Sequence, residues 1–248
     1  MKLSLRCVLF MLPAVATLCR GEVLSIPAIK DATLYESPTG GLANGAGASI
    51  FAGRTNQETG SIRRAVIEFD LQALPANAVI NSATLTLNMV NTAGSAVTIA
   101  LHRLTREWTE GTTVAGGNGG GGGTPVTGGD ATWLHATSPG TSWTGPGAAG
   151  DFIGLPSSTA AVGGAAGLYS WTGMVSDLQM WLADSSTNHG WIIIGDETES
   201  SSAVRFDSRS STAGTAPQLI VDFTVVPEPG TALLLVPGLL LLARRRSR

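Results

Sequence analysis

Two tryptophans and two arginines are the side chains in this sequence best suited to bind a sugar. Trp133 and Trp143 lie in polar stretches rich in Gly and Pro, where an exposed indole ring is costly unless it contacts a ligand. Arg64 and Arg205 alternate with apolar residues, so both are expected to point outward from strands. Pyranose C–H faces stack on aromatic rings, and guanidinium groups pair with carboxylates. These four residues are therefore the candidate carbohydrate-binding residues.

A structural role is the alternative for the same side chains. Each arginine would then pair with a carboxylate across neighbouring strands, Glu68 or Asp207, and Trp143 would cover one end of the fold. Trp108 and Trp191 follow strand-like patterns, and we expect both in the core.

The sequence contains a weak pattern for a metal site. Its three histidines are far apart and have neither Cys partners nor His-x-x-His spacing, which argues against zinc. Calcium is the better candidate, because Asp31, Asp130 and Asp151, with Glu110, lie in or beside loops rich in Gly and carbonyl oxygen. No stretch has the spacing of an EF-hand, so solvated loop carboxylates remain the alternative. No cofactor other than Ca²⁺ is expected.

Catalytic patterns are weaker still. Glu68 and Asp70 alternate on one strand face, as the carboxylate pair of a glycosidase would. Asp70, however, ends its strand at a corner, where a carboxylate commonly caps backbone N–H groups. The sequence has no G-x-S-x-G elbow. We expect a non-catalytic protein and keep a polysaccharide-degrading enzyme as the less favoured alternative.

Short strands of alternating pattern would position these residues. In residues 62–70, Ala65, Ile67 and Phe69 face one way, while Arg64 and Glu68 face the other. Such alternation predicts antiparallel strands with one buried and one solvated face. Many such strands with irregular links predict an all-β fold, an antiparallel jelly-roll β-sandwich. In residues 83–90, Leu85, Leu87 and Met89 are expected to face inward, as are Val97, Ile99 and Leu101 in residues 96–104. Further strands are predicted over residues 190–195, 203–207 and 218–224.

One stretch is predicted to be helical and another to be a loop. From Thr172 to Ala183, apolar residues recur at helical spacing and include Trp181, which we expect in the core; Thr172 suits the N-cap position. In residues 111–130, ten of twenty residues are glycine. This segment has little to bury and a large ordering entropy, so we expect a flexible surface loop without chemistry.

The two ends of the chain have the composition of export signals. Met1 to Gly21 begins with Lys2 and Arg6 and continues with the apolar residues 8–18, which is typical of a secretory signal peptide. A lipoprotein signal at Cys19 is disfavoured because Leu18 precedes it where a small residue is required. Both cysteines lie in this segment, so the exported domain has no disulfide.

Charge also separates the ends from the domain between them. Seven of the 15 Lys and Arg residues, but only one of the 18 Asp and Glu residues, lie in the two terminal segments. Residues 22–226 therefore carry eight basic and 17 acidic side chains, a formal charge of −9. Such a domain is a poor candidate for binding nucleic acid. It also repels polyanionic glycans unless a basic patch or bound Ca²⁺ intervenes.

The last 23 residues combine three patterns. Pro227, Glu228 and Pro229 form a rigid turn, residues 231–243 form an apolar run, and a cationic end follows with Arg244, Arg245 and Arg246. As a helix the apolar run would span roughly 20 Å, shorter than a stable membrane span. The arginines would stay on the cytoplasmic side. This arrangement predicts transient inner-membrane insertion, with an ordinary tail anchor as the alternative.

The tail at residues 226–248 closely resembles the PEP-CTERM sorting signal of bacterial exosortase substrates. The match covers the Pro-Glu-Pro motif, the apolar stretch and the arginines, in that order. The resemblance implies export through signal peptidase, processing by exosortase near the Pro-Glu-Pro motif, and delivery to the cell surface or the extracellular matrix.

Residues 22–225 are similar to the DNRLRE domain, also described as a carbohydrate-binding module of family ninety-six type. The resemblance begins at residues 62–87 with IRRAVIEFDLQALPANAVINSATLTL and extends over nearly the whole domain, from about Lys30 to Thr224. It implies an extracellular jelly-roll β-sandwich, with alginate-type binding known for some members. Ser210 stands where the family often has Glu, and the long glycine segment departs from the usual spacing. The matching motifs that follow in order are Arg106–Gly111, Thr132–Trp133, Thr141–Gly147, Trp181, Asn188–Trp191, Arg205–Arg209 and Pro217–Val221.

These patterns together predict a secreted surface or matrix protein of three parts. Residues 1–21 are the signal peptide, 22–225 the β-sandwich domain and 226–248 the sorting signal. The favoured function is binding of extracellular polysaccharide. A structural matrix protein without sugar binding, acting by packing or self-association, is the main alternative. Exposure of Trp143, Arg64 and Arg205 on one shared face would favour the first function, and burial or scatter the second.

Overall fold

A computed structural model describes residues 21–92 and 94–226. The predicted signal peptide, apart from Gly21, lies outside these residues. So do the predicted sorting residues Pro227, Glu228, Pro229, Arg244, Arg245 and Arg246. Within the described ranges, no helix has the length and apolar character that crossing a membrane requires.

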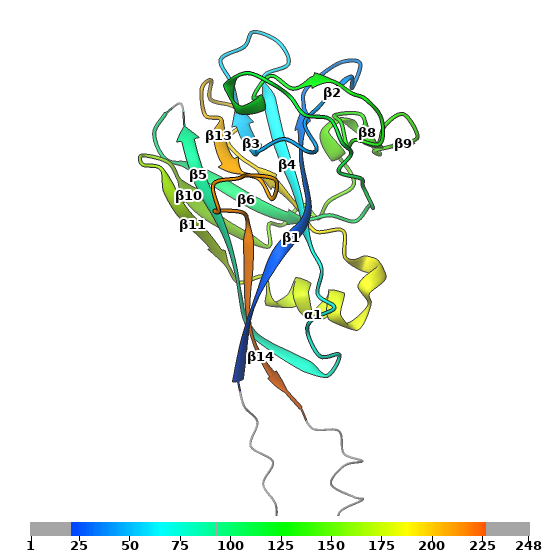
Figure 1. The fold of residues 1–248 in the computed structure, drawn as a ribbon, viewed down its shortest axis with the longest axis vertical. Coiled ribbons are helices and arrows are strands. Elements are labelled where there is room, and N and C mark those ends of the chain that lie inside the picture. Colours follow the sequence, from blue (N-terminus) through cyan, green and yellow to red (C-terminus); the bar gives the residue numbers. More distant parts are fainter. Residues whose placement is uncertain (1–20, 93, 227–248) are drawn as a thin grey trace, which may run out of the picture.

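The described chain folds mainly into antiparallel strands in two packed layers (Figure 1), which confirms the predicted all-β, β-sandwich-like class. The first layer contains the first half of β1 (Gly21–Tyr35), β14 (Gln218–Val225), β5 (Ala78–Thr92), β13 (Val204–Asp207) and β11 (Gly167–Thr172). The second contains the other half of β1, β4 (Ile62–Phe69), β12 (Trp191–Ile194), β6 (Val97–Arg103) and β10 (Ser158–Val162).

Two strands connect the layers. β1 pairs with β14 as far as Pro27 and then with β4 from Ala28 onward, so it bends from one layer into the other. β3 (Ser49–Arg54) pairs with β13 and, at Gly53 and Arg54, with β4. The remaining short strands are β2 (Leu42–Ala43) with β7 (Thr124–Pro125), and β8 (His135–Thr137) with β9 (Thr141–Ser142).

The principal core lies between the layers and follows the predicted alternation. On β5, Leu85, Leu87 and Met89 are fully buried, and Ile99 and Leu101 face them from β6. Burial of apolar surface at about 25 cal/mol per Å² is the main stabilising contribution of such residues. The predicted inward faces of these two strands are therefore confirmed.

The second layer is buried on its outer face as well, contrary to the expectation of one solvated face. Val66 on β4 and Ile192 on β12 point away from the principal core, yet both are fully buried. Residues 104–152 cover them and contribute Trp108 and Trp143 to a second hydrophobic core. A layer covered on both faces needs apolar residues at successive positions, as β12 has in Trp-Ile-Ile-Ile.

The helix begins later than predicted. α1 spans Val175–Ala183, with Met174 at its N-cap and no side-chain cap, because Thr172 still belongs to β11. The prediction that Thr172 caps the helix is wrong. The predicted burial of Trp181 is confirmed, since this residue packs in the principal core against Trp191 at 4.6 Å between ring centroids. Short 3₁₀ turns occur at η1 (Asn118–Gly120), η2 (Pro146–Ala148) and η3 (Ser185–Thr187).

The glycine-rich segment is attached to the sandwich rather than free of it. The Tyr35 hydroxyl donates a hydrogen bond to the Gly120 carbonyl at 2.7 Å, and Arg63 Nε donates to Gly121 O at 3.1 Å. Arg63 is fully buried and stacks on Tyr35, with 4.9 Å from Cζ to the ring centroid. Side chains of β1 and β4 thus satisfy two backbone carbonyls of this segment, and the expected flexibility of the loop stays a prediction.

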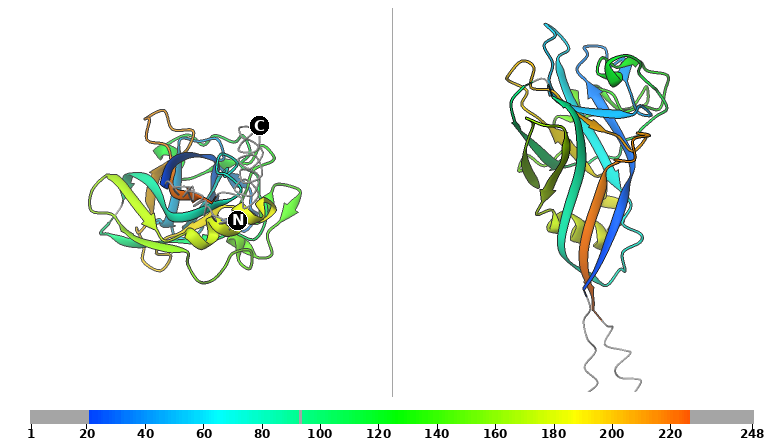
Figure 2. Two further views of the ribbon diagram at one scale, coloured as in Figure 1. Left: turned by 90° about the horizontal axis from the view of Figure 1, so that it is seen from below. Right: turned by 60° about the vertical axis from the view of Figure 1, so that its left-hand side comes forward.

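The two ends of the described chain lie at one pole. β1 and β14 lie side by side and run to the narrow lower end (Figure 2), where Gly21 is opposite Thr224. Both hydrophobic cores are built from residues between these two ends. The loops after β3 and around η1 lie at the opposite pole, uppermost in Figure 1, which we call the distal pole.

Candidate binding site

Arg205 is an unpaired cation at the distal pole. It lies on β13 between Phe51 of β3 and Asn91 of β5. Its Nε atom is buried and has no hydrogen-bond partner, and no carboxylate of the described residues forms an ion pair with its guanidinium. A partly buried guanidinium without a counter-ion is unfavourable, because part of its hydration is lost without replacement. Such a guanidinium is suited to bind a hydrogen-bond acceptor or an anionic group of a ligand.

The Arg205 side chain lines a hollow of about 340 Å³ that we call the Arg205 hollow. Phe51 provides an aromatic surface, although this side chain is largely buried. Four amide side chains supply both hydrogen-bond donors and acceptors. A guanidinium, amides and a ring edge together suit hydroxyl and carboxylate groups of a sugar. The amide side chains are Asn56, Gln57, Asn91 and Asn118.

The glycine-rich segment forms one wall of this hollow. Asn118, Gly121 and Gly122 contribute to its lining, and the Gly119 backbone lies against the Arg205 side chain. Gly119 has a φ of +65°, a conformation that favours glycine. The segment to which the sequence assigned no chemistry therefore shapes the candidate site.

A second hollow of about 500 Å³ adjoins Trp133. Its walls include Glu36, Glu58 and Arg54, so it combines acidic and basic groups. The Glu36 carboxylate already accepts a hydrogen bond from the backbone N–H of Ile62 at 2.9 Å. This hollow is less suited to an anionic ligand than the Arg205 hollow.

The other three predicted sugar-binding residues are largely buried or bound to groups of the protein itself. Trp143 is only 5% exposed, and its Nε1 donates to the Thr132 carbonyl at 2.9 Å. Trp133 is 8% exposed and lies beneath the Arg64 guanidinium, 5.3 Å from Cζ to the ring centroid. The expectation that these rings are exposed was wrong, because both pack in the second core rather than in free loops.

Arg64 forms an ion pair, but not with the predicted partner. Its Nε and Nη2 bind the two carboxylate oxygens of Glu197 at 2.7 and 2.8 Å, and Nη1 donates to Gly147 O. The prediction of a cross-strand pair with Glu68 was wrong, as was the pairing of Arg205 with Asp207. Asp207 instead accepts hydrogen bonds from Asn88 and Ser211. Arg64 and Arg205 lie in different layers, and the predicted residues do not share an exposed face.

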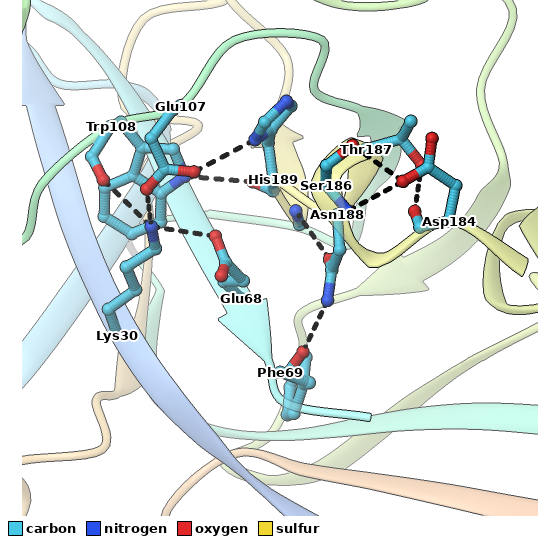
Figure 3. Close-up of polar contacts among 11 residues, drawn as sticks. Lys30, Glu68, Phe69, Glu107, Trp108, Asp184, Ser186, Thr187, Asn188 and His189 are labelled. Carbon is cyan, nitrogen blue, oxygen red and sulfur yellow. Dashed lines mark hydrogen bonds and ion pairs between the residues drawn. The ribbon is translucent and has the colours of Figure 1, made fainter. Parts of the chain in front are cut away.

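A polar cluster near α1 supplies the buried Glu68 carboxylate with a cation (Figure 3). Lys30 Nζ lies 2.9 Å from Glu68 Oε2 and 2.6 Å from Glu107 Oε1, and it donates to the Trp108 carbonyl. His189 Nδ1 lies 3.0 Å from the second Glu107 oxygen. Burial raises the pKa of Glu68, and Lys30 opposes this shift. For Glu107, burial is outweighed by hydrogen bonds from Lys30 and His189, which lower its pKa.

The carboxylate pair considered for catalysis is held in structural contacts. Glu68 is bound to Lys30, and Asp70 Oδ1 accepts the backbone N–H of Gln72 at 2.9 Å, as expected for a corner cap. Asn188, next to the cluster, donates to the Phe69 carbonyl at 2.8 Å (Figure 3). These contacts join the end of β4 to the turn before β12.

Two of the calcium candidates are neighbours, because the Asp31 backbone N–H donates to Glu110 Oε1 at 2.8 Å, but the four do not gather into one site. Asp130 accepts hydrogen bonds from Thr113, and Asp151 from Thr144 and Arg106. Asp31 is fully buried, and its Oδ2 accepts the Arg209 N–H at 2.6 Å, while Glu110 is bound to Arg209. Among the described residues, no group of three or more His, Cys, Asp or Glu side chains is arranged to hold a metal ion.

The fold and site together define an antiparallel β-sandwich-like domain with a polar hollow at its distal pole. No protein-family model matches the chain, and no curated protein matches it.

Proposed function

We propose that this protein is an exported, non-catalytic surface or exopolysaccharide-matrix protein whose jelly-roll domain binds extracellular polysaccharide in the Arg205 hollow. The uncompensated guanidinium of Arg205, set among amide side chains, carries the proposal. Arginine pairs bidentately with carboxylates, and amides bind sugar hydroxyls. The similarity of residues 30–224 to a carbohydrate-binding module supports the same function.

The positions of the C-terminal end and of the Arg205 hollow, at opposite poles, agree with attachment through the C-terminal end. β14 ends at the pole opposite the loops after β3 and around η1 (Figure 1), and residues of those loops line the Arg205 hollow. A domain held at that end during transient insertion in the inner membrane, with exosortase and signal peptidase as its processing partners, would present the hollow away from the membrane. Secretion to the cell surface or matrix is the proposed destination, on the resemblance of the tail to a PEP-CTERM signal.

An acidic polysaccharide is the favoured ligand class, because the hollow contains one unpaired cation and no carboxylate side chain. The domain as a whole is acidic, with a formal charge of −9. Long-range repulsion should therefore slow association at low salt, and added salt or Ca²⁺ should relieve it. A neutral polysaccharide would show no such dependence.

Isothermal titration calorimetry of the 21–226 segment tests the proposal. Neutral and acidic polysaccharides are titrated into the protein, once in the presence of Ca²⁺ and once in the presence of a chelator. Arg205→Gln is expected to weaken binding at least about tenfold, equivalent to roughly 1.4 kcal/mol. Arg54→Gln is the matched control, because Arg54 lies at the same pole but lines the second hollow.

Two results would overturn the proposal. Absence of binding to every polysaccharide would favour the structural matrix protein that binds no sugar. Equal losses in Arg205→Gln and Arg54→Gln would place any binding outside the Arg205 hollow. A polysaccharide-degrading enzyme is the less favoured alternative, and cleavage of any titrated polysaccharide would revive it.

A further inference from the structure

β10 and β11 are edge strands of the ten-stranded sheet, and they follow one another in the chain. β11 pairs with β5 and β10 pairs with β6, and neither has a second strand beside it among the described residues. β1 closes the opposite side of the sandwich by pairing with both β14 and β4. Figure 1 shows β10 and β11 side by side at the left-hand margin.

The edge formed by β11 lacks the usual protection against strand pairing. Proteins commonly block exposed edges with charged residues, proline or bulges. The sequence Gly-Leu-Tyr-Ser-Trp-Thr of β11 has no charge and no proline, and its ladder with β5 runs without a register shift. Leu168 is 68% exposed on this strand. An unprotected edge of this kind is a template for another strand.

The side of the molecule around this edge is electrically neutral. Residues 71–101, which include β5 and most of β6, contain no Asp, Glu, Lys or Arg. Residues 152–176, which include β10 and β11, contain none either. The charges of the domain, formally −9, lie on other segments; the nearby Asp207 of β13 accepts a hydrogen bond from Asn88, the register partner of Leu168, and is only 5% exposed. Two copies therefore approach each other with least repulsion on this neutral side.

We propose that β11 of one copy pairs antiparallel with β11 of a second copy. A second copy fits this edge because identical acidic domains repel elsewhere, whereas the neutral edge offers the same backbone groups from both sides. In a register centred on Ser170, Leu168 of each copy lies opposite Thr172 of the other, a favourable apolar and β-branched pair. The pairing is isologous, so it closes as a dimer and continues the β5 layer across a two-fold axis.

The proposed dimer leaves the candidate site open and does not rest on sugar binding. Met89 of β5 pairs with Gly167 of β11 on one side and with Phe206 of β13 on the other. Arg205 and its hollow therefore lie across β5 from the proposed interface. The two-fold axis reverses the second copy, so the two hollows would be turned in opposite directions, and Gly21 and Val226 of each copy would remain at that copy's own narrow pole.

Sedimentation velocity of the 21–226 segment over a range of concentrations tests the dimer. The wild-type segment is expected to sediment increasingly as a dimer with rising concentration, and Leu168→Lys to weaken association at least tenfold. Val23→Lys is the matched control, because Val23 is 69% exposed on β1 and remote from β11. It should associate as the wild type does.

Amide hydrogen exchange locates the interface, which the sedimentation of the dimer does not. The backbone amides of β11 should exchange more slowly in the wild-type dimer than in the Leu168→Lys monomer, while those of β1 should not change. A wild-type segment that remains monomeric at every concentration would overturn the proposal. Equal association by both lysine variants would overturn it as well, since the interface would then lie elsewhere.

Discussion

The Arg205 guanidinium lies directly against the backbone of Gly119. A Cβ atom on residue 119 would come within 2.5 Å of Arg205 Nη1 and 3.2 Å of Cδ. The absence of a side chain at this glycine is therefore a condition for the position of Arg205. The contact between Gly119 and Arg205 therefore links the glycine-rich segment to the chemistry of the candidate site.

Gly119→Ala is expected to displace the Arg205 side chain and weaken polysaccharide binding about tenfold in calorimetry, close to the effect of losing a charged hydrogen bond. Gly117→Ala is the matched control. Gly119 is in the left-handed region (φ 65°, ψ 21°), where alanine costs about 1 kcal/mol, and Gly117 (φ 67°, ψ 144°) is in a region that alanine adopts less readily, so the control variant should lose at least as much stability. Residue 117 has open space where a Cβ would lie. Equal affinities in the two variants would contradict the proposed role of Arg205.

Trp143→Phe should change stability and not binding. The substitution keeps most of the ring in the second core but removes the Nε1 donor from the Thr132 carbonyl. A buried acceptor without a partner costs about 1 to 3 kcal/mol, which urea denaturation can measure. Polysaccharide affinity at a temperature where the variant is folded should equal that of the wild type. A selective loss of affinity would restore Trp143 as a binding residue.

Lys30→Met should destabilise the domain because it leaves the buried Glu68 carboxylate without its cation. We expect a loss of about 3 kcal/mol at neutral pH. The loss should be smaller at acidic pH, because the raised pKa of Glu68 allows that carboxyl to become neutral.

Glu107→Gln is the control for the Lys30 variant, since it removes the other carboxylate bound to Lys30. Glu107 is 63% exposed, so this loss should stay below about 1 kcal/mol. Equal losses in Lys30→Met and Glu107→Gln would show that the Glu68 contact is not the dominant one.

Asp31 should make the domain less stable as pH rises through the acidic range. Burial raises the pKa of its carboxyl from 3.8 to about 7, and the hydrogen bond from the Arg209 N–H only partly offsets this. The folded state therefore binds a proton more tightly than the unfolded chain. The stabilisation is fully present below about pH 4 and is lost as pH rises to about 7, a change on the order of 4 kcal/mol.

Urea denaturation of the wild type and Asp31→Asn at several pH values between about 4 and 8 checks this prediction. The asparagine side chain does not titrate, so the variant should lack the part of the slope that Asp31 contributes. Parallel stability profiles would show that the carboxyl has an ordinary pKa in the folded state.

The sequence predicted the principal core better than the second core. Alternation on β5 and β6 identified Leu85, Leu87 and Ile99 correctly, because one face of these strands remains solvated. The second core was missed because composition suggested that the segments around Trp133 and Trp143 were free loops. The signal available was the run Trp-Ile-Ile-Ile in β12, where successive apolar residues require both faces to be covered.

The longest missed element, β1, was obscured by one residue. Pro27 interrupts its pattern, and proline within a run argues against a strand. In the structure Pro27 lies where β1 leaves one layer and joins the other, so its missing N–H falls at the transition. Arg205 was a candidate from the sequence and stays one, although its surroundings were not predictable. Gln57, Asn91 and Asn118 reach the hollow from distant parts of the chain.

The placement of β14 bears on how the domain resists mechanical force. This strand is hydrogen bonded to β1 over Gln218–Thr224 and to β5 over Gln218–Val225. If the C-terminal end is held and the distal pole is pulled, the load runs along the strand, perpendicular to its hydrogen bonds. Both ladders must then shear together instead of opening one bond at a time. A domain attached in this way can transmit tension from a bound polymer without losing its last strand.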